Sequence, residues 1–335
     1  MKISKYFMVA AASIMMFGCA KNDDVRSLAD EGPVALTIKI ADPQLGSKAA
    51  VDPTTATEIT WDEVTVTLNA ISGGRSETIT KQQATEGYTF WDVEGPQSVE
   101  VSINGGKATY TDLTEFNSKA ATDVPVYGMS SDFRYVGTAK NPDNSTEYNL
   151  YEIEVTAQIP VARLELSGIK HAAHEEGKGC WYSAITFDKI ELRGAPSGAT
   201  FKDGAFAVTD DVVSDLEETI LAEGNDFKTY TFPDPETNKC YAFNMFAGMP
   251  TLRFTFTRST ADGAINEQEA YAVVKTFKDD SGEIISFEAG KIYQITDIQI
   301  ADESITPDPD GNTLVAVDVT VKVAPWTIVN TTVEF

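Results

Sequence analysis

The segment at residues 34–40 reads VALTIKI: its even-numbered residues are all apolar, and its odd-numbered residues after Ala35 are polar. Alternation with a period of two is typical of a β-strand that buries one face. The same pattern recurs at residues 64–70, 99–103 and 252–256, and glycine-rich stretches such as residues 72–74 supply turns between the segments. The sequence therefore predicts an all-β protein.

Residues 211–221 are the exception to this pattern. Val212, Leu216 and Ile220 recur there at a spacing of four, which is typical of one face of a helix. We expect one short helix in this segment.

The side of the chain that carries the apolar residues changes at Pro160. Odd-numbered residues are apolar from 151 to 159, whereas even-numbered residues are apolar from 162 to 166. A shift of one residue exchanges the buried and exposed faces, so the strands before and after Pro160 are expected to face different cores. The length also favours two domains over one. We therefore predict two β-sandwiches in tandem, at residues 34–160 and 161–335.

The first 19 residues, MKISKYFMVAAASIMMFGC, combine two early lysines with an apolar run and end in Gly18-Cys19. The run is too short to span a bilayer, which indicates an export signal over residues 1–18 that is removed. The ending resembles a bacterial lipobox, which implies that Cys19 becomes the first residue and carries acyl chains that hold the protein on a membrane. The alternative is an ordinary secretory signal. Residues 19–33 are polar and are expected to form a flexible tether.

Composition limits the partners and the chemistry. The chain has 51 acidic and 26 basic residues and a net charge of -25, so a nucleic acid would be repelled. Besides Cys19 it has only Cys180 and Cys240, which would form either a disulfide or two free buried thiols.

Residues that could carry catalysis are scarce. His171 and His174 could share a metal only in a helix, and Gly177 and Gly179 indicate a loop instead. No nucleophile elbow, phosphate loop or dinucleotide motif is present in the sequence. We therefore expect no enzymatic activity, no metal and no cofactor. The aromatic run Tyr88-Thr89-Phe90-Trp91 would bind sugars or proteins if it were exposed, and would otherwise be a packed strand.

Two segments near the ends of the chain have unusual features. Residues 41–58, after the first strand, contain proline, glycine and a single basic residue, Lys48, and are expected to form an exposed, cleavable loop. Residues 314–335 alternate over 22 positions, which would span about 70 Å as one strand, so part of the segment is expected to bend back or leave its domain. The alternative is that it forms the last strand of the second sandwich. Its apolar face comprises Val315, Val317, Val319, Val321, Val323, Val329, Val333 and Phe335.

Several segments together resemble the fimbrillin family of major fimbrial subunits. They are the lipobox, the first strand with its basic loop, and the segments at residues 124–128, 160–166, 287–293 and 319–326. The resemblance implies two transthyretin-like β-sandwich domains, export as a lipoprotein, and a cut by a trypsin-like surface protease after the first strand. By position, the scissile bond is Lys48-Ala49, although the family more often has arginine there.

The resemblance also implies how subunits would assemble. The strand at residues 34–40 would leave, and a C-terminal strand from residues 314–335 of another copy or a related subunit would replace it in a type V pilus. The expected location is the outer membrane, through Cys19, and then the fimbria. A surface lipoprotein that binds glycan or host protein through a β-sandwich is the alternative. The sequence leaves open whether the subunit would belong to the stalk, the anchor or the tip.

Overall fold

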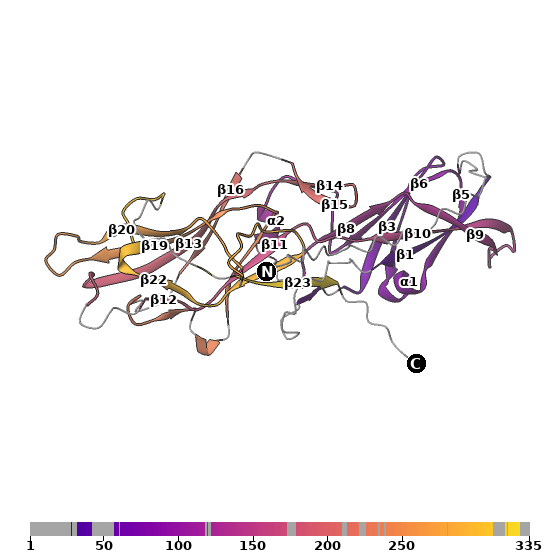
Figure 1. Ribbon diagram of the computed structural model, residues 1–335. Helices are drawn as coiled ribbons and strands as arrows, with labels where there is room; N and C mark the ends of the chain where they lie inside the picture. Colours follow the sequence, from indigo (N-terminus) through magenta and orange to yellow (C-terminus); the bar gives the residue numbers. More distant parts are fainter. Residues whose placement is uncertain are drawn as a thin grey trace, which may run out of the picture.

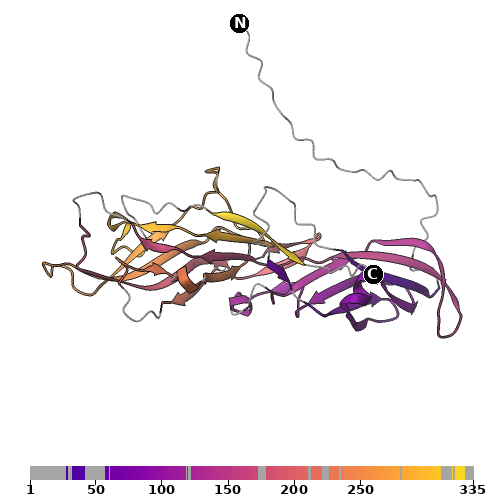
Figure 2. The same cartoon turned by 90° about the horizontal axis from the view of Figure 1, so that it is seen from below.

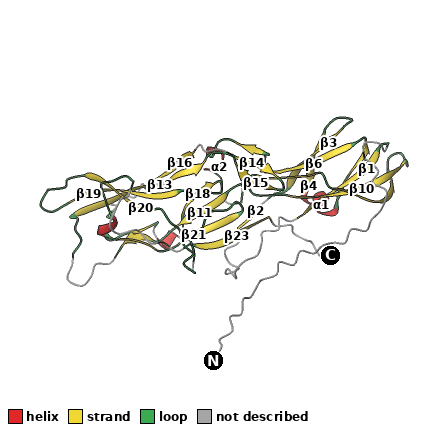
Figure 3. Cartoon of the chain, turned by 45° about the horizontal axis from the view of Figure 1, so that its top comes forward, coloured by secondary structure: helices red, strands yellow, loops and turns green. Residues whose placement is uncertain are grey.

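The computed structural model describes residues 28, 32–41, 57–59, 61–117, 119, 122–172, 179–209, 213–220, 226–233, 235–237, 239–279, 281–310, 319 and 321–328. Over these residues the chain is an elongated molecule built almost entirely of β-strands (Figures 1 and 3). The prediction of an all-β protein is therefore confirmed. Within the described part, no helix is both long enough and apolar enough to cross a membrane.

Two four-stranded sheets form the half that is drawn in indigo and purple (Figure 1). One has the order β5-β1-β10-β9 and the other the order β4-β3-β6-β8. Alternate residues of β3 and β6 are buried, as the period of two predicted, and contribute to the hydrophobic core together with the buried face of β1. The strands are β1 (Val34–Ala41), β3 (Glu63–Ala70), β4 (Arg75–Thr80), β5 (Tyr88–Val93), β6 (Pro96–Ile103), β8 (Val126–Ser130), β9 (Phe133–Lys140) and β10 (Glu147–Thr156).

The other half carries four more sheets, with the orders β18-β11-β21-β23-β2, β17-β12-β22, β16-β13-β19-β20 and β15-β14-β7. Figure 2 shows them extending away from the sheet that holds β1. The strands are β2 (Thr57–Ile59), β7 (Thr109–Tyr110), β11 (Ala162–Leu166), β12 (Ile169–His171), β13 (Ala184–Pro196), β14 (Ala199–Lys202), β15 (Ala205–Val208), β16 (Val213–Thr219), β17 (Thr231–Phe232), β18 (Tyr241–Met245), β19 (Thr251–Ser259), β20 (Gln268–Val274), β21 (Lys291–Ile295), β22 (Ile298–Ile300) and β23 (Lys322–Ile328).

Aromatic packing fills the interior of this half. The ring of Phe187 on β13 stacks on Phe256 of β19 at 5.3 Å between centroids, and Phe227 lies 4.8 Å from Phe256. All three side chains are fully buried. Such contacts add to the burial of apolar area that holds the sheets together.

The change of apolar parity at Pro160 coincides with a change of sheet. Tyr151 and Ile153, before it, are buried in β10, which pairs with β1 and β9. Leu164 and Leu166, after it, are buried in β11, which pairs with β18 and β21. The one-residue shift therefore marks the point where the chain passes from one sheet to another.

The prediction of a helix at residues 211–221 is wrong. Residues 213–219 form β16, which pairs antiparallel with β13 and places Leu216 opposite Leu192. A spacing of four is also two strand periods, so the apolar residues fit either structure, and pairing with β13 decides for the strand.

The described helices lie elsewhere. The first is α1 (Lys81–Glu86), whose N-cap Thr80 and N3 residue Gln83 form a reciprocal capping box. The others are α2 (Thr114–Asn117) and two 3-10 turns, η2 (Pro235–Thr237) and η3 (Asp302–Ser304).

Candidate functional site

The first strand, β1, lies in the middle of its sheet. It pairs antiparallel with β5 on one side and parallel with β10 on the other, where residues 35–41 stand opposite residues 150–156 (Figure 1). A strand in this position hydrogen-bonds along both edges. Its neighbours β5 and β10 would therefore each have an unpaired edge if β1 were absent.

The even-numbered side chains of β1 anchor it in the core. Ile38 is fully buried and stands opposite Tyr88 of β5 and Ile153 of β10. Burial of a valine, leucine or isoleucine side chain stabilises by roughly 1.5–3 kcal/mol, so β1 is a substantial part of this core. The residues of β1 that are at most 1% exposed include Val34, Leu36 and Ile38.

The opposite face of β1 makes polar contacts with both neighbours. The hydroxyls of Thr37 and Thr89 on β5 lie 2.8 Å apart. Lys39 donates to Glu152 of β10 at 3.1 Å, and Arg134 of β9 donates to the same carboxylate at 2.9 Å. The hydrogen bonds from Lys39 and then Arg134 hold the pKa of Glu152 below its usual value.

The predicted lipidation and processing residues lie outside the described part of the chain. These are Cys19, Lys48 and Ala49. The strands on either side of the predicted cut belong to different sheets, because β1 pairs with β5 and β10 whereas β2 pairs with β23.

The predicted donor segment is packed within its own subunit wherever it is described. Val319 and Val321 are buried, and the amide of Val321 donates to the carbonyl of Lys278 at 2.9 Å. Val323 lies in β23, opposite Tyr293 of β21. Residues 322–328 therefore follow the alternative interpretation, a strand of the subunit's own sheet. The members of the predicted set that lie outside the described residues are Val315, Val317, Val329, Val333 and Phe335.

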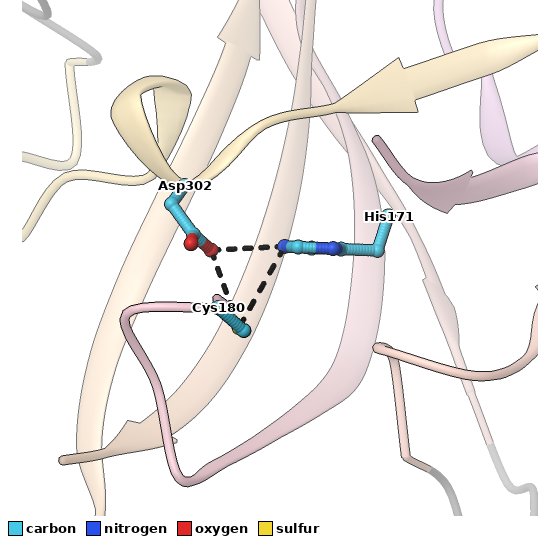
Figure 4. Close-up of side chains that lie close together, drawn as sticks. All are labelled: His171, Cys180 and Asp302. Carbon is cyan, nitrogen blue, oxygen red and sulfur yellow. Dashed lines mark hydrogen bonds and ion pairs between the residues drawn. The ribbon is translucent and has the colours of Figure 1, made fainter. Parts of the chain in front are cut away.

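Neither alternative for Cys180 and Cys240 holds in full: both thiols are free rather than bridged, but Cys180 is half-buried and Cys240 is exposed rather than buried. Cys180 instead faces His171, at the end of β12, and Asp302 of η3 (Figure 4). Burial, together with the negative charge of Asp302, raises the pKa of the Cys180 thiol. His174 lies outside the described residues. Sequence reasoning missed this cluster, because Asp302 is 131 positions from His171 and belongs to no recognisable motif.

The aromatic run at residues 88–91 lies in β5, beside β1. Phe90 is 4% exposed and packs edge-on against Tyr88 at 5.1 Å, while Trp91 contacts Tyr148 at 6.0 Å. Tyr88 and Trp91 are half-buried. The run is therefore part of a packed strand and does not form the exposed platform that glycan binding would favour.

The fold is similar to that of several solved structures. No protein family model matches the chain, and no curated protein matches it by sequence. A candidate cell adhesion protein from Bacteroides eggerthii is similar in structure, with a TM-score of 0.54 and 16% identity over 89% of this chain and 97% of that one. A fimbrilin from Porphyromonas gingivalis has a TM-score of 0.52 and 14% identity over 90% of this chain and 99% of that one. The resemblance to the fimbrillin family is thus confirmed at the level of the fold.

Proposed function

We propose that the chain is a structural subunit of a cell-surface fimbria, built of two transthyretin-like β-sandwiches, that assembles by exchanging β1 for a strand of another subunit. The observation that carries the proposal is the position of β1. It is the first strand of the described residues, yet it lies between β5 and β10 in the middle of a sheet. A cut after it would separate it from the rest of the chain and would break no other strand among the described residues.

The contacts of β1 support the proposed exchange. Its departure would leave unpaired backbone groups on β5 and β10, and an apolar groove where Leu36 and Ile38 had packed. Both are costly in water, and a new strand that alternates apolar and polar residues would satisfy both.

The segment that follows β23 in the sequence is the best candidate for the donor strand. Residues 322–328 already pair with β21 and β2, and Val321 is buried, so their use as a donor would first require those contacts to break. Residues 329–335 follow directly, and seven extended residues span about 23 Å, close to the length of β1. Val329, Val333 and Phe335 would share one face of that segment if it were extended, as the even-numbered residues share one face of β1.

The supply and activation of subunits complete the proposal. An acylated Cys19 would hold the subunit on the outer membrane until a surface protease cut the Lys48-Ala49 bond. The acyl chains and β1 would remain together on the N-terminal fragment. The rest of the subunit would then be free to enter a fimbria for adhesion or biofilm formation.

Replacement of Lys48 tests the processing step. Lys48→Ala should leave a full-length lipoprotein that does not polymerise, whereas Lys48→Arg should be cut and polymerise, because trypsin-like proteases accept either basic residue. N-terminal sequencing of surface protein should give Ala49 for the wild type and for Lys48→Arg. Normal fimbriae from Lys48→Ala would exclude this bond as the activation site.

A charge on the donor face tests the exchange itself. Val333→Asp should abolish polymerisation while the monomer stays folded, because a carboxylate would be buried without a partner in the groove of the neighbour. Thr332→Asp places the same charge on the opposite face and should leave polymerisation largely intact. Equal loss in the two variants, or none in Val333→Asp, would argue against residues 329–335 as the donor.

A further inference from the structure

Three side chains that bind metals in other proteins converge in the half of the molecule away from β1. His171 ends β12, Cys180 lies in the segment before β13, and Asp302 begins η3 (Figure 4). Nε2 of His171 lies 2.9 Å from Oδ1 of Asp302 and 4.0 Å from Sγ of Cys180. Sγ lies 3.6 Å from the same Oδ1. One nitrogen, one sulfur and one oxygen therefore form a closed triangle.

We propose that His171, Cys180 and Asp302 form a binding site for a divalent metal ion of the zinc class. The dimensions of the triangle suit such an ion. Bonds of about 2.0–2.3 Å from a tetrahedral zinc ion place its ligand atoms roughly 3.3–3.6 Å apart, so shifts of about half an ångström would complete the site.

The donor set selects the kind of metal. Imidazole nitrogen, thiolate sulfur and carboxylate oxygen are the ligands that zinc takes in proteins. Calcium and magnesium prefer oxygen ligands, so the nitrogen and sulfur atoms of this set do not suit them. The net charge of -25 also favours the approach of a cation over that of an anion.

The surroundings hold two of the ligands in place. The side chains of His171 and Asp302 are only 5% and 1% exposed, so both are fixed in the interior. The second carboxylate oxygen, Oδ2 of Asp302, accepts a hydrogen bond of 2.8 Å from the backbone amide of Trp181. A second-shell contact of this kind orients a ligating carboxylate. Cys180 is only half-buried and Trp181 is exposed, so an ion has a route from solvent.

The geometry disfavours a catalytic triad of the same residues. In such a triad the imidazole uses one nitrogen for the nucleophile and the other for the carboxylate. Here the same nitrogen, Nε2, faces both Sγ and Oδ1. A metal ion is the species that all three atoms could contact at once. On binding, the thiol of Cys180 would lose its proton to solvent, and a neutral His171 would bind through the lone pair of Nε2 with its ring proton on Nδ1.

Cobalt titration tests the site, because Co²⁺ occupies zinc sites and gives a thiolate-to-metal charge-transfer absorption. The wild type should develop this absorption at one equivalent, and Cys180→Ser should lose it. Cys240→Ser is the matched control, because it removes the other free cysteine among the described residues, which is exposed, and should keep the absorption. Zn²⁺ should raise the Tm of the wild type and of Cys240→Ser, but not that of Cys180→Ser.

A second measurement uses only the wild type, so it does not depend on whether a variant folds. Zn²⁺ should slow the alkylation of Cys180 in the wild type at least tenfold and leave that of Cys240 unchanged, as read by peptide mass spectrometry. Absence of the charge-transfer band, an equal band in Cys180→Ser, or equal alkylation with and without Zn²⁺ would each overturn the proposal. The site lies in the opposite half from β1, so either outcome is independent of the proposed strand exchange.

Discussion

The side chain of Ile38 tests whether β1 leaves the subunit on assembly. Ile38 is fully buried between Tyr88 and Ile153, so Ile38→Ala removes packed atoms on both sides of the strand. Replacement of a buried isoleucine by alanine costs about 2–5 kcal/mol, from the lost burial and the cavity that remains. With a urea m-value of about 3 kcal/mol/M, the unprocessed monomer should unfold at roughly 1 M less urea than the wild type.

Ile153→Ala is the matched control. Ile153 stands opposite Ile38 in the register and is 1% exposed, so the same substitution removes the same atoms from the neighbouring strand. In the unprocessed monomer the two variants should be destabilised by similar amounts. In fimbriae, Ile38→Ala should be as stable as the wild type, because β1 would be gone, whereas Ile153→Ala should keep its deficit, because β10 would stay.

Urea unfolding of both forms provides the assay, followed by tryptophan fluorescence, with Trp91 on β5 as a reporter close to β1. The chain has several sheets and can unfold in more than one step, so the variants are compared at the transition that Trp91 reports. Fimbriae in which Ile38→Ala is as unstable as Ile153→Ala would show that β1 remains in the assembled subunit. The reasoning would then be refuted.

Two further predictions concern the anchor and the polar face of β1. Cys19→Ser should move the protein from the detergent phase to the aqueous phase on detergent partitioning, because no acyl chain would hold it; retention in the detergent phase would contradict lipidation. The pKa of Glu152 is lowered by Lys39 and then by Arg134, so this contribution to stability is complete above the unfolded-state pKa and is lost as the pH falls through the lower folded-state pKa. Hydrogen exchange at the β1 amides should therefore accelerate in acid, relative to a Glu152→Gln variant, and an identical pH dependence in the two would contradict this.

Local pattern was enough to predict strands and turns, because the buried face of each strand leaves a period of two in the sequence. The strands at residues 34–41, 63–70, 96–103 and 251–259 follow it. The pattern failed at residues 213–219, where a spacing of four fits a strand as well as a helix. It also missed α1, although Thr80 and Gln83 carry the spacing of a capping box.

Contacts between segments that are far apart in the sequence could not be predicted from the local alternation of apolar and polar residues. Nothing near Val34 indicates that β1 pairs in parallel with β10, more than 100 positions later. Likewise, Asp302 is one of 51 acidic residues, and only the fold brings it to His171 and Cys180. The alternation at residues 314–335 predicted extended structure but not which sheet would receive it, because a period of two is the same in either sheet.

The position of β1 also indicates that cleavage alone would not release this strand from the subunit. Val34, Leu36 and Ile38 are buried in the core, and their burial together stabilises by roughly 5–9 kcal/mol, before its backbone hydrogen bonds are counted. Exposure of these side chains to water would oppose the spontaneous loss of β1 after a cut. A donor strand would therefore have to displace β1 progressively rather than wait for an open groove. Under the proposed function, cleavage between β1 and β2 would make the subunit competent for assembly, and the arrival of the next subunit would drive the exchange.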